Sequence, residues 1–216
     1  MICVMNLLFM SYVMYICQVD TGVCVMRVSR EQFAEHRKRI LDVAGRLFRE
    51  NGYAGIGVAD IMKAAGLTHG GFYGHFESKD ELAAEASRGA LARTAERWSK
   101  LVKGAPERPL QALVRHYLSD RHRQDRAEGC VLASLGADAA RQDKPVRAAF
   151  VEGLKPLINL LARIVPGRSA AIRRRRALST LSEMVGAMVL ARAVDDDKLA
   201  AEILEASLLS LNDPQT

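Results

Sequence analysis

Apolar side chains recur every three or four residues through most of this chain, which is the period of an α-helix. The first such stripe predicts a helix that starts at Glu31 or Glu35 and runs to Asn51, with Ile40, Ala44, Leu47 and Phe48 on its buried side. Gly52 then marks its end, because glycine readily adopts the positive φ found after a helix C-terminus. Strand patterns are nearly absent after residue 27, so the sequence predicts an all-α fold.

Residues 57–76, GVADIMKAAGLTHGGFYGHF, predict two short helices joined by a tight turn. The first, over about residues 58–65, places Val58, Ile61, Met62 and Ala65 on one buried face. Gly66 stands where the chain needs a positive φ. Thr68 is then expected to be the N-cap of a second helix over about residues 69–75, with its hydroxyl accepting a hydrogen bond from the backbone.

The second of these helices has an unusual content. Gly70 and Gly71 lie in its first turn, where each glycine costs about 0.5 to 1 kcal/mol of helix stability relative to alanine. A helix pressed against a large surface would offset this cost, because missing side chains allow a close approach. His69, Tyr73 and His75 would then project around the gap, and the major groove of DNA fits this description.

The motif extends beyond the two helices. Its elements are Gly52-Tyr53, Asp60-Ile61, Ala64-Ala65-Gly66-Leu67, Phe72-Tyr73, His75-Phe76 and Ser78-Lys79. Together they resemble the DNA-binding domain of TetR-type (TetR/AcrR-like) transcriptional regulators, over about residues 37–82. The resemblance implies a three-helix DNA-binding head in residues 27–82, followed by a helical ligand-binding and dimerisation domain in residues 83–216. It also implies a cytoplasmic repressor that binds a palindromic operator in double-stranded DNA and responds to a small-molecule effector.

The residues expected to contact DNA come from the motif and from the first helix. They are Arg37, Lys38, Gly57, Val58, Thr68, His69, Gly70, Gly71, Tyr73, His75 and Lys79. The family usually has Ser or Thr at the position of Gly57, so one phosphate contact is in doubt here. Solvated side chains are the alternative for Arg37, Lys38 and Lys79.

The remaining pattern predicts six further helices. Ser78 and Glu81 read as a capping box that opens a long helix over residues 79–102. The others are expected over about residues 109–123, 130–141, 144–165, 170–193 and 197–211, with a kink at Pro156. Trp98, Tyr117, Cys130 and Phe150 are expected to bound an effector pocket, and a plain hydrophobic core is the alternative for all four.

The last helix is apolar on more than one side. Leu199, Ile203, Leu204, Ala206, Leu208 and Leu211 cover it. Such a helix needs a partner on each side. We therefore expect a homodimer through a four-helix bundle made by the last two helices of each subunit, with Gly186 and Ala187 allowing a close approach.

Charge and cysteine content add little to this picture. The net charge of +6 and the pI of about 9.3 permit nucleic-acid binding. However, residues 27–80 hold nine basic and seven acidic residues, whereas residues 141–176 hold ten basic and two acidic ones. That second segment is either a solvated helical region or an anion-sensing one. Four cysteines without CxxC spacing predict neither a disulfide framework nor a metal site, and no cofactor is expected.

Residues 1–26 differ from the rest, with one charge and an apolar run of about 16 residues. They lack the basic start of a signal peptide and the length of a spanning helix. We expect translation to begin at Met26, and no stable membrane association. A membrane-tethered interaction protein is one alternative. An α-helical enzyme is another, although the chain has no P-loop, dinucleotide fingerprint, HExxH motif or nucleophile elbow.

Overall fold

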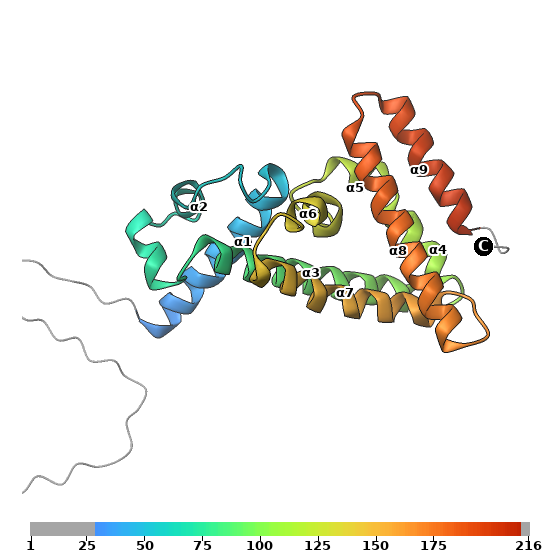
Figure 1. The fold of residues 1–216 in the computed structure, drawn as a ribbon, viewed down its shortest axis with the longest axis horizontal. Helices are drawn as coiled ribbons and strands as arrows, with labels where there is room; N and C mark the ends of the chain where they lie inside the picture. Colours follow the sequence, from blue (N-terminus) through green and yellow to red (C-terminus); the bar gives the residue numbers. More distant parts are fainter. Residues whose placement is uncertain (1–28, 213–216) are drawn as a thin grey trace, which may run out of the picture.

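The computed structural model describes residues 29–212, and within that range every element is helical (Figure 1). The elements are α1 (Arg30–Asn51), α2 (Val58–Ala64), a 3₁₀ helix η1 (His69–Gly74), α3 (Lys79–Gly104), α4 (Pro109–Tyr117), α5 (Asp120–Gln124), α6 (Val131–Ala139), α7 (Lys144–Ile164), α8 (Ala170–Ala193) and α9 (Asp197–Asn212). The predicted all-α fold is confirmed. Residues 1–26, with the expected start at Met26, lie outside the described residues.

Helix α1 forms where the apolar stripe predicts it. Ser29 accepts a hydrogen bond from the Gln32 amide at 3.1 Å, and the Gln32 side chain accepts one from the Ser29 amide at 3.0 Å. This capping box provides acceptors for two backbone N–H groups that have no acceptor within the helix. At the other end, Gly52 has φ 77°, as expected for the glycine that ends the helix.

Helices α3 and α7 form the long axis of the larger domain and lie side by side (Figure 1). The Ser78 hydroxyl accepts the Glu81 amide hydrogen at 3.1 Å and so caps α3 as expected. The reciprocal half of the predicted capping box is wrong, because the Glu81 carboxylate accepts from the amide of Glu77 at 2.6 Å instead. Helix α7 continues through Pro156, from Lys144 to Ile164.

The contact between α3 and α7 depends on the absence of a side chain at Gly153. A Cβ atom there would lie 2.5 Å from Cβ and 2.8 Å from Cγ of Leu91, which is fully buried. We expect Gly153→Ala to lower the free energy of unfolding by about 1–3 kcal/mol through overpacking, measured by urea denaturation. Gly136→Ala in α6 is the matched control, since a Cβ there meets no described atom within 4 Å. It should raise stability by about 0.4–1 kcal/mol, and equal effects of the two changes would contradict this account of the α3–α7 contact.

The prediction of one helix over residues 109–123 is wrong. Helix α4 ends at Tyr117, and α5 begins at Asp120. The Ser119 hydroxyl donates to the His116 carbonyl at 2.9 Å and accepts from the His122 amide at 3.2 Å. These local bonds end one helix and cap the next, which is how serine competes with helix continuation.

The four residues expected to bound an effector pocket are buried in the core of the larger domain. The rings of Trp98 and Tyr117 pack edge to face, with centroids 5.8 Å apart, and Cys130 and Phe150 are also buried. None of the four lines the cleft between Arg123 and Asp197 or the cleft between Arg49 and Arg97. Their burial fits the core alternative, and their role around an effector pocket stays a prediction.

Helices α8 and α9 form an antiparallel hairpin at the end of the molecule away from α1 and α2 (Figure 1). Ser169 caps α8 by accepting from the Ile172 amide at 3.2 Å. Arg173 and Arg176 donate to the carbonyls of Gly167 and Pro166, so half of the four-arginine run anchors the preceding loop. Between residues 29 and 212, no helix is both long and apolar enough to cross a membrane.

Candidate nucleic-acid interface

The first helix of the motif and its turn form as predicted. Ile61 and Met62 of α2 are buried, and Ala65 is buried after the helix ends. Gly66 has φ 68°, and the amide of Leu67 donates back to the Met62 carbonyl at 2.9 Å. This is the glycine-dependent turn that ends many helices. Gly57 is the N-cap of α2, and because glycine has no side chain it makes no capping hydrogen bond.

The second helix of the motif is a 3₁₀ helix, η1, and not an α-helix. The amide of Gly71 donates to the Thr68 carbonyl at 3.0 Å, and the amide of His75 donates to the Phe72 carbonyl at 2.8 Å. These bonds span three residues, the 3₁₀ pattern that suits short segments. Thr68 occupies the N-cap, but its hydroxyl makes no capping hydrogen bond, so that part of the prediction is wrong.

One aromatic residue anchors η1, and the next one faces outward. Phe72 is buried and stacks with Phe76 at a centroid distance of 5.7 Å. Tyr73 is 70% exposed, and His69 beside it is also exposed. A side chain at Gly70 or Gly74 would meet no described atom within 4 Å, so the packing of the chain itself does not require glycine there.

His75 does not project outward as expected. Its ring stacks on Phe33 of α1 with centroids 4.1 Å apart, and His36 lies at its edge at 6.3 Å. Its Nδ1 atom is buried without a hydrogen-bond partner. Burial, followed by the nearby His36 and Arg37, lowers the pKa of His75. The ring therefore holds the end of η1 against α1.

Arg37 is also engaged within the protein. Its two terminal nitrogens donate to the two carboxylate oxygens of Glu85 on α3, both at 2.7 Å, and its guanidinium lies 4.6 Å from the centre of the Phe76 ring. The Glu85 bond is the main cause that raises the pKa of Arg37, and the same bond lowers the pKa of Glu85. This paired arginine joins α1 to α3 next to η1.

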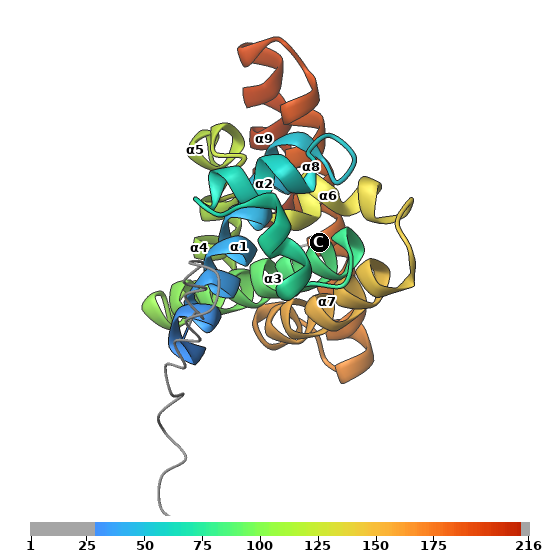
Figure 2. The same cartoon turned by 90° about the vertical axis from the view of Figure 1, so that its left-hand side faces the viewer.

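The other predicted DNA-contacting residues remain exposed or half-exposed on the surface of the head. Lys38 is exposed and forms only a 3.6 Å ion pair with Asp42, and Lys79 is half-buried at the first turn of α3. The exposed or half-exposed members near η1 are Gly57, Val58, Thr68, His69, Gly70, Gly71 and Tyr73. Seen from this end, α1 and α2 lie in front of the larger domain (Figure 2). The head thus presents a short backbone segment with few side chains, next to a lysine at a helix start.

Sequence reasoning missed the contacts that hold the head against the larger domain. The amide of Tyr53 donates to the Asp138 carboxylate of α6 at 2.7 Å, and the Tyr53 hydroxyl pairs with that of Ser87 on α3 at 2.7 Å. Burial raises the pKa of Tyr53 to about 12. Arg49 of α1 reaches the loop between α5 and α6. The partners lie 34 to 85 residues apart, so no local pattern signals them.

Comparison with known proteins agrees with this geometry. Residues 40–86 match the family model described as "Bacterial regulatory proteins, tetR family". The chain is 42% identical over 59 residues to the HTH-type transcriptional regulator AcrR of Shigella flexneri, a match that covers 27% of each protein. It is 25% identical over 154 residues to the HTH-type transcriptional repressor DhaR of Mycobacterium sp. (strain GP1), covering 69% of this chain and 76% of that one.

Solved structures share the helical arrangement over most of the chain. The structure of reduced NemR from Escherichia coli superposes with a TM-score of 0.69 at 19% identity, covering 82% of this chain and 95% of the other. A TetR transcriptional regulator from Chloroflexus aurantiacus J-10-FL gives a TM-score of 0.67 at 26% identity, covering 84% and 94%. The match to AcrR thus covers about a quarter of the chain, while the fold likeness extends through the larger domain.

Proposed function

We propose, because the chain belongs to the TetR family of bacterial regulatory proteins, that it is a transcriptional repressor that binds a palindromic operator as a homodimer. The observation that carries this proposal is the geometry of η1. The buried ring of Phe72 anchors the segment to the core, and Tyr73 and His69 are exposed. Gly70 has no side chain, so another molecule can approach the backbone closely there. A major groove can accept such a segment, and Lys79 and Thr68 would then contact backbone phosphates.

The dimer is proposed from the distribution of exposed apolar side chains. Among the described residues, nine large apolar side chains are exposed, and six of them lie on α8 and α9. They are Ile172, Leu178, Val189, Leu190, Leu199 and Leu209. Such a concentration on one helical hairpin marks an association surface. A twofold dimer would present two copies of η1 to half-sites about one helical turn apart or somewhat more.

Leu190 offers a direct test of this dimer surface, because it is 58% exposed on α8. Leu190→Glu is expected to convert the protein from a dimer to a monomer at about micromolar concentration, since the twofold axis would bury two carboxylates. Sedimentation velocity measures the change. Val151→Glu is the matched control, because Val151 is equally open to solvent at 56% but lies on α7. A dimer that survives Leu190→Glu, or dissociates with Val151→Glu instead, would contradict the proposed interface.

The remaining parts of the proposal concern the effector and the place of action. Regulation by a small molecule in the larger domain is proposed from family membership, and residues 83–216 are assigned to that role and to dimerisation. The same membership argues against an enzyme, and a DNA-binding repressor would act in the cytoplasm. Operator titration with and without candidate compounds, in the same buffer and salt, tests the effector proposal.

A further inference from the structure

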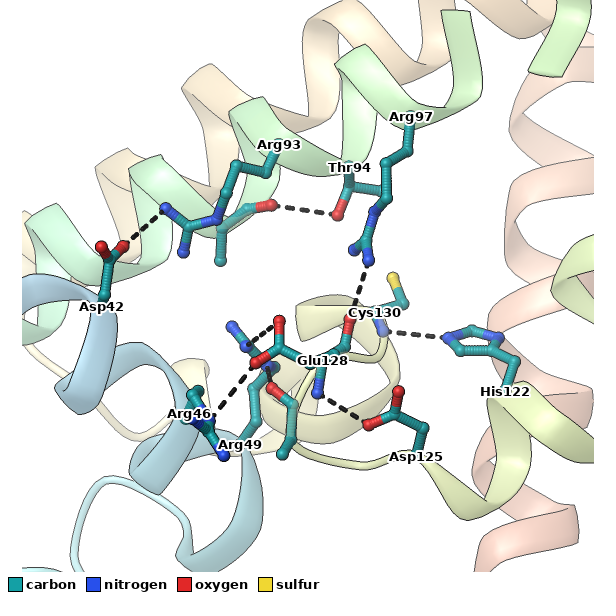
Figure 3. A network of polar contacts seen from close by, with 12 residues as sticks. Asp42, Arg46, Arg49, Arg93, Thr94, Arg97, His122, Asp125, Glu128 and Cys130 are labelled. Carbon is teal, nitrogen blue, oxygen red and sulfur yellow. Dashed lines mark hydrogen bonds and ion pairs between the residues drawn. The ribbon is translucent and has the colours of Figure 1, made fainter. Parts of the chain in front are cut away.

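A small cleft lies where the head meets the larger domain. It has a volume of about 220 Å³ and lies between α1, the middle of α3 and the loop before α6 (Figure 3). We call it the junction cleft, and its lining residues are Arg49, Ala90, Arg93, Glu96, Arg97, Lys100, Glu128 and Gly129. Its lining is charged, with Ala90 as the sole apolar side chain among these residues.

Positive charge exceeds negative charge in the junction cleft. Four of the lining side chains are cationic, and two, Glu96 and Glu128, are carboxylates. Glu128 is shared, because it lies 3.3 Å from Arg46 and 3.8 Å from Arg49. Burial lowers the pKa of Arg49 most, Glu128 and Asp125 oppose this, and the charges of Arg93 and Arg97 lower it further. The cleft therefore holds more cationic charge than its own carboxylates neutralise.

The guanidinium groups have hydrogen-bonding capacity left over. Arg49, whose side chain is 4% exposed, donates from Nε to the Ala127 carbonyl at 2.5 Å. Arg97 donates from Nη1 to the Glu128 carbonyl at 3.1 Å and, within residues 29–212, forms no ion pair. Arg93 pairs with Asp42 through one nitrogen at 3.3 Å. Each guanidinium carries five N–H donors, so every one of them keeps donors for a further acceptor.

The arginines also converge from two helices. A point at the Cβ position of Gly45 lies 3.6 Å from Nη1 of Arg49 and 3.7 Å from Nη2 of Arg93. Figure 3 shows Arg97 reaching from α3 toward the loop that Arg49 contacts from α1, while Arg93 reaches from α3 toward Asp42 of α1. Planar guanidinium groups that converge in this way bind carboxylate or phosphate oxygens in pairs.

The size and lining indicate the kind of occupant. Drug-sized ligands fill pockets of about 300–1,000 Å³, and this cleft is smaller and has charged side chains on six of its eight lining residues. We propose that the junction cleft binds a small anion with two or more negative charges, of the phosphate or polycarboxylate class, between Arg49 of α1 and Arg93 and Arg97 of α3.

Such a ligand would act on DNA binding through the position of the head. It would draw Arg49 toward α3 and compete with Glu128 for it, which changes how α1 sits on the larger domain. Since α1 also packs against His75 at the end of η1, the shift reaches the DNA-facing segment. A coupling of this kind changes operator affinity by about 5- to 150-fold. The coupling rests on the proposed function, whereas the binding of the anion does not.

The binding is tested by isothermal titration calorimetry of the full chain with inorganic phosphate and, separately, with citrate, at constant ionic strength. We expect one saturable site per chain for one or both probes, and a dissociation constant about 10- to 100-fold weaker in Arg97→Gln. Arg88→Gln is the matched control, because Arg88 lies on the same helix and removes the same charge but pairs with Glu152 outside the cleft. It should bind as the wild type does. Absence of saturation with both probes, or equal weakening in both variants, would overturn the proposal.

The coupling is tested by operator titration of the same three proteins with and without the probe that binds. At an anion concentration about equal to the wild-type dissociation constant, operator affinity of wild type and Arg88→Gln should change measurably, toward at least about 5-fold at saturation, while Arg97→Gln should need an about 10- to 100-fold higher concentration for the same change. Saturable anion binding with unchanged operator affinity would overturn the coupling. If no operator is bound at any anion concentration while calorimetry shows the site, the proposed function fails and the anion site stands.

Discussion

Replacing Tyr73 with alanine is expected to weaken binding to a selected operator by about 30-fold or more. A side chain that reads a base or positions the backbone contributes about 1–3 kcal/mol, and a dimer on a palindrome loses that amount twice. The predicted loss is therefore about 2–6 kcal/mol of binding free energy. Tyr73 lies next to the anchored Phe72 and is 70% exposed, so its removal should leave the free energy of unfolding within about 0.5 kcal/mol of wild type.

Electrophoretic mobility shift or fluorescence anisotropy at fixed salt measures this effect, together with a urea melt of each protein. Tyr73→Phe separates the two parts of the side chain, because it keeps the ring and removes the hydroxyl. Retained affinity in Tyr73→Phe would assign the contact to the ring. Wild-type affinity in Tyr73→Ala would show that η1 does not approach DNA through this residue.

Lowering the pH from 7 to 4 is expected to destabilise the protein by about 3 kcal/mol through His122 alone. The backbone amide of Cys130 donates to Nε2 of His122 at 3.0 Å, so Nε2 must be the unprotonated nitrogen. Nδ1 then carries the proton and bonds the Tyr117 carbonyl at 2.6 Å. A second proton at Nε2 would face a donor, inside a site that Arg192 already crowds with positive charge.

The direction follows from the pKa values of the two states. Burial, followed by the nearby Arg192, lowers the pKa of His122 in the folded protein to about 4, against 6.5 in the unfolded chain. As the pH falls below 6.5, His122 becomes protonated in the unfolded chain but stays neutral in the folded protein until about pH 4. Stability is thus complete above pH 6.5 and is lost at about 1.4 kcal/mol per pH unit until about pH 4.

Urea denaturation of wild type and His122→Gln across pH 7 to 4 measures this contribution as the difference between two profiles. A glutamine can accept from the Cys130 amide and cannot be protonated. Between pH 7 and pH 4, the free energy of unfolding of His122→Gln should therefore fall by about 3 kcal/mol less than that of the wild type. His69→Gln, on the exposed surface of η1, controls for the removal of one histidine and should keep the wild-type profile. Parallel profiles for wild type and His122→Gln would contradict the assignment.

The parts of the fold that could be predicted are those determined by residues close in sequence. Gly52 and Gly66 have a positive φ because each follows the end of a helix, where the chain reverses direction within a few residues. Ser78 caps α3 for the same local reason. The 3₁₀ form of η1 was missed, because the same apolar spacing suits either helix type over six residues.

The parts that could not be predicted depend on distant partners. Arg37 is indistinguishable from a phosphate-binding residue until Glu85, 48 residues away, is placed beside it. His75 is drawn inward by Phe33, and Arg49 is drawn to a loop 78 residues away. Helical periodicity reports which face of a helix is buried, but not which helix covers it. The candidate site could therefore be located from the sequence, while its supporting contacts could not.

The central claim is that η1 reads a symmetric operator, and selection of DNA from random fragments by the full chain tests it most directly. Selections run side by side with Tyr73→Ala and Lys79→Ala, across a salt series, report base reading and phosphate contact separately. We predict enrichment of one palindrome by the wild type, its loss with Tyr73→Ala, and weaker binding with a smaller salt dependence for Lys79→Ala. Uniform, salt-sensitive binding without an enriched sequence would contradict the claim.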